Sequence, residues 1–407
     1  MKSAVLQKDA KYLLLGSAMR GIAIGSLGIA LPIYLGELGV ATVIIGIFLA
    51  VSNLSAGVMN GLSGTLGSRF GGKRLLVIMG ILIALANIVY AVTTDVRIIL
   101  LTAGLAVASA SGSGAGAIWG GPVGAVHRAM LAGNVSDEGR NRVFGLNAFV
   151  ATIAAAGGAL LVGLPDYLGA FGGMERPAGF SIFFLILATV GILASVSVLP
   201  IKNTLVRGPS LPVKSRRLVA KLSAFNFSDG FAWALVFPLI SLWFHLRFSA
   251  DLTSLALVFA GANLVSAFAF LGSGYLADRI GAVKSLFSIR IATALLTLGL
   301  AMAPTFNIAV LMLIIRIITS VMFAPIWQSY LMGVIPADER APAGAVTSVA
   351  WRASTTISPP TSAYLMQSVS LTLPFYFSAV IQLITYTFFF TGFRNIKPPE
   401  EVKKSQR

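Results

Sequence analysis

The chain has 407 residues, of which 57% are hydrophobic and only 11% are charged. Soluble domains carry about 25% charged residues, so this balance excludes an ordinary water-soluble globule. The absence of cysteine excludes disulfides, thiolate metal sites and cysteine nucleophiles. With only two histidines, His127 and His245, and no HExxH motif, we expect no metal site, no cofactor and no enzyme activity.

Long apolar runs follow one another along the whole sequence. About 20 apolar residues cross the hydrocarbon core of a bilayer as a helix. The first run is too long for the core of a cleavable signal peptide. We therefore predict an all-α integral membrane protein with twelve transmembrane helices in two six-helix bundles. The predicted spans are residues 12–36, 41–64, 75–93, 97–126, 143–164, 179–200, 221–246, 252–276, 285–304, 307–333, 341–367 and 372–393.

The net charge of +16 follows the membrane topology. Most Lys and Arg residues fall in the two tails and in alternate connections, whereas Arg97, Arg176 and Arg247 fall on the opposite side. Cytoplasmic loops carry the excess of Lys and Arg, so we expect both termini in the cytoplasm of a multi-pass plasma-membrane protein. These bases also suit anionic lipid headgroups of the bilayer. No soluble basic domain is present to bind nucleic acid.

The two halves of the chain resemble each other. Residues 201–220 are basic and proline-containing, and we interpret them as a cytoplasmic linker between residues 1–200 and residues 221–407, which end in a short cytoplasmic tail. "LGIALPIYLGELGV" and "WALVFPLISLWFHL" align Pro32 with Pro238. "GTLGSRFGGKR" and "GYLADRIGAVK" then follow at similar distances, and "VSDEGRNRVFG" and "IPADERAPAGA" form a third pair. Three landmarks in the same order predict an internal duplication.

The motif "GYLADRIGAVK" resembles the signature loop of the major facilitator superfamily, which follows the second span of each half. The resemblance covers almost the whole chain and implies twelve spans, a monomer, and transport of a small-molecule substrate. In that family the loop acts as a conformational latch, and Ser68 stands where the family has Asp. We expect Asp278 and Arg340 to form the better of the two latches. The matching latch residues are Gly64, Ser68, Arg69, Gly71, Lys73, Gly274, Asp278, Arg279, Gly281 and Lys284, with Arg140 and Arg340 from the companion loops.

Ionisable residues inside predicted spans are functional candidates, because each costs about 2.5–3.5 kcal/mol to insert at the helix centre. Arg290 lies near the cytoplasmic end of its span, so we expect its side chain to reach the membrane surface. Arg20 and Asp229 occupy nearly equivalent places in the two halves, and we predict an ion pair between them across the halves when the cytoplasmic side is closed. Asp229 is also the candidate proton-coupling group, because it is the only acid deep in any predicted span. The alternative is a static pair that holds helices together.

Polar side chains recur on one face of three spans. Residues three or four apart share a helix face. The Pro-Pro pair in "SPP" (358–360) is expected to kink or break its helix. The candidate cavity residues are Arg20, Asn226, Asp229, Trp233, Arg316, Ser320, Phe323, Trp327, Arg352, Thr355 and Thr356.

Three of these candidates are arginines (Arg20, Arg316 and Arg352) and only one is an acid (Asp229), so the predicted cavity has a net positive charge. This favours an anionic solute, because guanidinium binds carboxylate and phosphate through two parallel hydrogen bonds. The alternative is that each arginine bonds backbone carbonyls or reaches the surface. We therefore predict a secondary transporter of an organic anion, a carboxylate or phosphate ester, driven by a proton or solute gradient as antiporter or symporter. A multidrug efflux antiporter, with Trp233, Trp327 and Trp351 lining the pocket, stays open. A further alternative is a membrane receptor or scaffold that does not transport. Its only support is Ser68, which replaces the Asp of the family motif.

Overall fold

The computed structural model describes residues 8–105, 126–127, 130–131, 140–202, 215–336 and 339–394. Regular secondary structure in these ranges is helical, and ten segments are long and apolar enough to cross a membrane by length and composition. The all-α membrane fold is thereby confirmed. The predicted span 97–126 lies mostly outside the described residues. The predicted span 341–367 is a long helix that is more polar than the ten.

The helices pack as two compact units. Unit 1 comprises Met1–Gly208 and Ile240–Ala267, and unit 2 comprises Pro209–Leu239 and Phe268–Arg407. The units therefore differ from the predicted halves in residues 240–267, which pack with unit 1. The reason lies in helix α11 (Ile240–Phe248), which packs against helix α1 (Lys8–Glu37).

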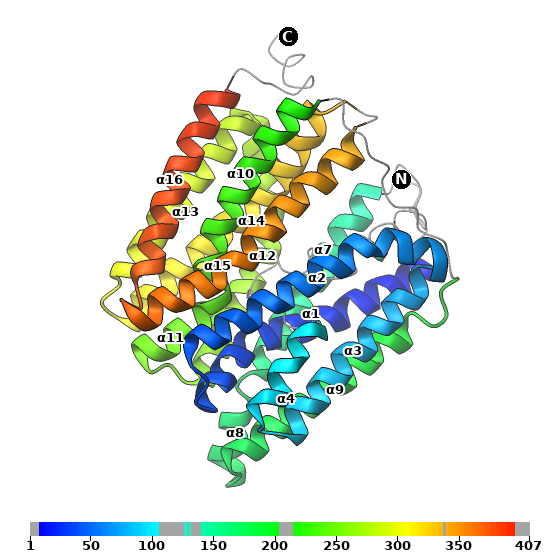
Figure 1. The fold of residues 1–407 in the computed structure, drawn as a ribbon, viewed down its shortest axis with the longest axis vertical. Helices are drawn as coiled ribbons and strands as arrows, with labels where there is room; N and C mark the ends of the chain where they lie inside the picture. Colours follow the sequence, from blue (N-terminus) through cyan, green and yellow to red (C-terminus); the bar gives the residue numbers. More distant parts are fainter. Residues whose placement is uncertain are drawn as a thin grey trace. The chain divides into compact units, whose positions relative to one another are not determined.

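In unit 1, α1 packs against α7 and α9, and α3 packs against α9 (Figure 1). Small residues allow the close approach of α1 to α7: a methyl group on Gly25 would collide with the backbone of Ala155. The remaining helices of unit 1 are α2 (Thr42–Phe70), α3 (Gly72–Val92), α4 (Val96–Leu101), the 3-10 turn η1 (Thr102–Leu105), α7 (Arg140–Leu161), α8 (Leu164–Gly172), α9 (Arg176–Ser197) and the first part of α12 (Leu252–Ile280).

Unit 2 repeats this pairing. Helix α10 packs against α15 and α16, and α13 packs against α16, as α1 and α3 do with α7 and α9 (Figure 1). The internal duplication inferred from three sequence landmarks predicts this correspondence. Besides the end of α12, the elements of unit 2 are α10 (Arg216–Ala234), η4 (Phe237–Leu239), α13 (Ala282–Met302), α14 (Phe306–Val334), α15 (Arg340–Ser368) and α16 (Leu373–Phe393).

The two signature motifs have the same backbone geometry. Gly71 joins α2 to α3 with φ 82° and ψ 153°, and Gly281 joins α12 to α13 with φ 86° and ψ 155°. This region of backbone space is almost restricted to glycine. The glycine of each motif is therefore required by the turn itself, and its neighbouring bases stand at the helix ends, where Arg69 and Arg279 are exposed.

The seventh predicted span is broken. Helix α10 ends at Ala234 and α11 begins at Ile240, with only the short turn η4 between them. Pro238 contributes to the break, because proline has no amide hydrogen to donate to the carbonyl four residues before it. Its partner in the repeat, Pro32, lies inside a continuous α1.

Hydroxyl groups of neighbouring helices bind the carbonyls that end α10. Ser358 and Ser362 of α15 donate to the carbonyls of Phe231 and Leu235 at 2.7 and 2.5 Å, and Ser378 of α16 donates to that of Ala232 at 2.6 Å. The bonds to Ala232 and Leu235 satisfy carbonyls that a helix end leaves open, whereas the carbonyl of Phe231 also accepts from the amide of Leu235. Of the kink or break predicted at the Pro-Pro pair of α15, the break does not occur, because α15 is continuous through this pair. Its serines bind carbonyls of the α10 end on both sides of the pair.

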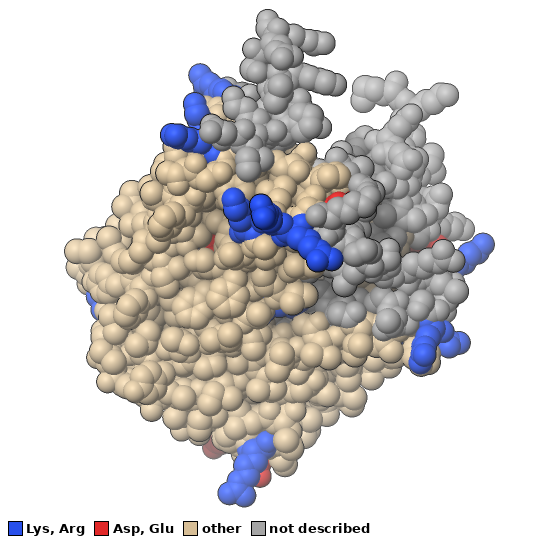
Figure 2. Space-filling view, turned by 45° about the horizontal axis from the view of Figure 1, so that its top comes forward, with Lys and Arg blue, Asp and Glu red and all other residues tan. Residues whose placement is uncertain are grey.

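The surface of the helices is strongly apolar. Figure 2 shows a face whose larger part carries no charged side chain, with Lys and Arg at its edges and in one group in the upper middle of the view. Large exposed hydrophobic side chains include Leu101, Leu257 and Phe388, which are 79%, 62% and 73% exposed. Such a surface matches the hydrocarbon of a bilayer and not water.

Candidate functional site: a buried arginine cluster

Asp229 of α10 forms a buried ion pair inside unit 2. Its Oδ2 atom lies 2.8 Å from Nη2 of Arg290 on α13, and both side chains are almost fully buried. Arg290 also donates from Nε to the hydroxyl of Tyr386 at 3.0 Å. The expectation that Arg290 reaches the membrane surface is therefore wrong. Arg290 faces inward on α13, beside the only acid of α10, so Asp229 pairs with Arg290 within unit 2. The pair of Asp229 with Arg20 across the two halves stays a prediction.

An aromatic layer supports this pair. The guanidinium of Arg290 lies 3.8 Å from the ring centroid of Phe323, which is itself stacked on Trp327. Both aromatic side chains, predicted as cavity residues, are 5% and 6% exposed and belong to the hydrophobic core of unit 2. They act as a packed floor beneath Arg290, which gains a desolvated cation–π contact.

Arg316 of α14 is the second buried cation. It is fully buried, and its Nε donates to the hydroxyl of Thr297 at 2.8 Å. The Thr297 hydroxyl in turn donates to the carbonyl of Thr293, which aims its lone pairs at Arg316. The guanidinium also lies 5.0 Å from the ring centroid of Phe237. Both Nη atoms of Arg316 are buried without a hydrogen-bond partner.

Further unsatisfied polar atoms lie in unit 2. They include Asp229 Oδ1, Arg290 Nη1, Ser320 Oγ and both amide atoms of Gln382 on α16. Buried polar atoms are normally hydrogen-bonded, and exceptions mark positions for water, an ion or a ligand. Gln382 was not predicted as a site residue, although an amide in an apolar span one turn before Tyr386 is a signal that the sequence contains.

Other predicted residues have partners of their own. Asn226 donates to the carbonyl of Thr347 at 3.2 Å. Thr355 and Thr356 donate to the carbonyl of Arg352, so their hydroxyls are used within α15. Trp233 is half-buried and stacks on Phe237 with ring centroids 5.0 Å apart.

Arg20 lies in a separate polar group within unit 1. Its Nη2 lies 2.8 Å from Nδ1 of His127, and Nε2 of the same ring lies 3.1 Å from Oδ1 of Asn147. Since guanidinium only donates, Nδ1 accepts and Nε2 carries the proton, which is the neutral tautomer. His127 was not predicted as a site residue, because its partners Arg20 and Asn147 come from α1 and α7, which are distant in sequence.

The latch residues are described only in part. The side chains of Ser68, Asp278, Arg140 and Arg340 lie outside the described residues, so the latch stays a prediction. A related contact is described instead: Glu339 accepts a hydrogen bond from the amide of Ser215 at 2.8 Å, beside the first residue of α10. A carboxylate at a helix N-terminus is stabilised by the helix dipole.

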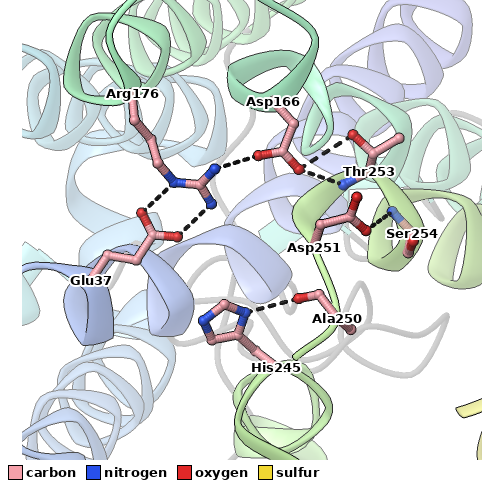
Figure 3. Close-up of polar contacts among 8 residues, drawn as sticks. All are labelled: Glu37, Asp166, Arg176, His245, Ala250, Asp251, Thr253 and Ser254. Atoms are coloured by element: carbon pink, nitrogen blue, oxygen red, sulfur yellow. Dashed lines mark hydrogen bonds and ion pairs between the residues drawn. The ribbon is translucent and has the colours of Figure 1, made fainter. Parts of the chain in front are cut away.

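A third polar group joins four helices of unit 1 at one end (Figure 3). Arg176 at the start of α9 binds Glu37 through Nε and Nη2 at 2.8 and 2.7 Å, and Asp166 of α8 through Nη1 at 2.7 Å. Asp166 also accepts bonds from the amide and hydroxyl of Thr253 on α12. This network explains why the first part of α12 packs with unit 1.

Comparison with known proteins gives a family match for the C-terminal part of the chain and a fold for nearly all of it. Residues 222–407 match the sequence model of the Major Facilitator Superfamily. No curated protein matches the chain.

Solved structures share the fold over nearly the full length at low identity. A bacterial homolog of the human lysosomal transporter Spinster, inward-facing and occupied, has a TM-score of 0.70 at 14% identity, over 95% of this chain and 96% of that one. The nucleoside transporter NupG has 0.74 at 12%, over 95% and 100%, and the xylose transporter XylE from E. coli has 0.71 at 11%, over 94% and 95%. Residues 222–407 are thus similar in sequence to the Major Facilitator Superfamily, and nearly the whole chain shares its fold with these solved transporter structures.

Proposed function

We propose that the protein is a secondary transporter that moves a small organic anion across the membrane by alternating access. One observation supports an anion as the substrate: Arg316 is fully buried, and both of its Nη atoms lack a hydrogen-bond partner. An unbalanced buried charge is costly, so a site of this kind favours an occupant of opposite charge. The structures that share the fold belong to proteins named as transporters, which supports transport as the activity.

Asp229 remains the candidate for proton coupling. It is a buried acid whose charge is balanced by Arg290, and one of its oxygens is unpaired. Protonation of Asp229 would leave Arg290 without its counter-charge. Proton binding and the net charge of the cluster are therefore coupled, which is the requirement for proton-driven anion transport.

A thermal-shift panel on the purified protein tests this proposal. Organic anions such as benzoate and butyrate are compared with the lipophilic cation tetraphenylphosphonium. A ligand at about 100 times its Kd stabilises by about 2.7 kcal/mol. We expect stabilisation by anions that is lost in Arg316→Gln and kept in Arg97→Gln, the same change at an exposed arginine. Stabilisation by the cation alone would contradict the proposal and favour drug antiport.

A further inference from the structure

The net charge of the buried cluster of Asp229, Arg290 and Arg316 limits the charge of a ligand that binds there. Asp229 and Arg290 neutralise each other at 2.8 Å. Arg316 is the one further charged side chain among the fully buried residues of the described spans in unit 2. Arginine keeps its proton in proteins, so the cluster carries one net positive charge. A single negative charge balances it, whereas a dianion would leave one charge unpaired in the interior.

The orientation of Arg316 determines how that charge is bound. Its Nε is occupied by Thr297, whose own proton is committed to the carbonyl of Thr293. The edge formed by Nη1 and Nη2 is the part left without partners. Two parallel donors at this edge match the two oxygens of a carboxylate.

The guanidinium also lies beside a row of aromatic rings. Phe237 lies 5.0 Å from Arg316, Trp233 stacks on Phe237 with an interplanar angle of 11°, and Trp351 lies 5.8 Å from Trp233. Trp233 and Trp351 are half-buried, whereas Phe237 is 4% exposed. The row therefore runs from the buried charge towards accessible space, and flat apolar groups stack well against it.

Phe237 lies where the backbone of this site is least regular. It lies in the break between α10 and α11, where no continuous helix fixes the backbone. The chain also passes from unit 2 to unit 1 between Leu239 and Ile240, two residues further along the chain. A small backbone change at the break would move the ring without disturbing α10, which is fixed by Ser358 and Ser378.

From these four observations we infer that Arg316 and Trp233 form the binding site for a planar, apolar monocarboxylate. The carboxylate binds Nη1 and Nη2, and the flat body of the ligand takes the place of the Phe237 ring between the guanidinium and Trp233. In the present state Phe237 covers the site. The inference rests on the proposed function and narrows its substrate class from organic anions to aromatic or similarly flat monocarboxylates.

Binding to the full-length protein in nanodiscs tests the inference, with calorimetry as the readout. The probes are benzoate (a flat monoanion), butyrate (an aliphatic monoanion), and phthalate and phenyl phosphate (flat dianions). We expect benzoate to bind about threefold to tenfold more tightly than butyrate, the stacking increment of an aromatic pair. Phthalate and phenyl phosphate should bind more weakly than benzoate.

Substitutions identify the groups. Arg316→Gln should weaken benzoate binding by about 30-fold or more, as loss of a buried charge partner does. Arg316→Lys, which keeps the charge but not the fork, should retain part of the binding and guards against misfolding of the first variant. Phe237→Ala should tighten benzoate binding because the competing ring is gone, whereas Phe388→Ala on the exposed face of α16 should not change it.

The outcomes separate the inference from the proposed function. If phthalate, phenyl phosphate or butyrate binds best and its binding depends on Arg316, anion transport stands and the monocarboxylate inference is overturned. Weaker or unchanged benzoate binding in Phe237→Ala overturns the covering role. If no anion binds in a way that depends on Arg316, both the inference and the proposed function fall.

Discussion

Removal of Arg290 alone should be among the most damaging single changes in unit 2. The variant Arg290→Gln takes away the ion pair with Asp229 at 2.8 Å, the bond to Tyr386 at 3.0 Å and the stacking on Phe323 at 3.8 Å. Asp229 is then left charged in the interior. Breaking a buried pair from one side costs about 3–5 kcal/mol, and this term dominates the other two.

The double variant Asp229→Asn/Arg290→Gln separates the pair from its parts. It removes both charges at once, so we expect it to recover most of the stability lost by Arg290→Gln. Arg290→Lys keeps the charge but not the geometry and should fall between. The assay is denaturant unfolding of the purified protein in one detergent, followed through tryptophan fluorescence. A single variant as stable as the parent, or a double variant whose loss equals the sum of the singles, would refute the reasoning.

Three further predictions concern other parts of the fold. Gly281→Ala should lower the free energy of unfolding by about 1–3 kcal/mol, because φ 86° with ψ 155° strains any residue with a side chain. The control is Gly261→Ala, which lies inside α12 with open space around it. Ser362→Ala should cost about 1–3 kcal/mol, because the buried carbonyl of Leu235 loses the donor that its broken helix no longer supplies; an unchanged unfolding midpoint would contradict this. Hydrogen bonds from Ser254 lower the pKa of Asp251, so its stabilising contribution is present above the ordinary carboxyl pKa and lost as the pH falls through the folded value. Thermal unfolding of Asp251→Asn should therefore differ from the parent at neutral pH and converge with it in acid; a constant difference at every pH would speak against this.

The fold could be predicted because its signals are local. Apolar runs give the spans, and the glycine of each signature motif gives the turn that Gly71 and Gly281 form with nearly the same dihedral angles. The break in the seventh span was missed, although Pro238 marks it. A proline alone does not predict a break in a helix, since Pro32 and the pair Pro359 and Pro360 lie in continuous helices. At the break in the seventh span, carbonyls of α10 and Leu235 accept hydrogen bonds from Ser358, Ser362 and Ser378, which are distant in sequence.

The partners of the buried charges could not be predicted for the same reason. The sequence identifies Asp229 as an acid inside a predicted span, but which residue it pairs with depends on which face of α13 turns inward. Depth along a span was the only guide to Arg290, and it pointed to the membrane surface. The unpaired fork of Arg316 required knowledge of Thr297 and Phe237, which come from two other helices.

Anion transport that depends on Arg316 is the central claim, and flux through the reconstituted protein tests it most directly. Proteoliposomes containing the parent, Arg316→Gln or Arg97→Gln would be given radiolabelled benzoate with and without a proton gradient, and tetraphenylphosphonium in parallel. The account predicts benzoate flux above that of empty liposomes in the parent and in Arg97→Gln, and none in Arg316→Gln. Equal benzoate flux in all three, or flux of the cation alone, would contradict it.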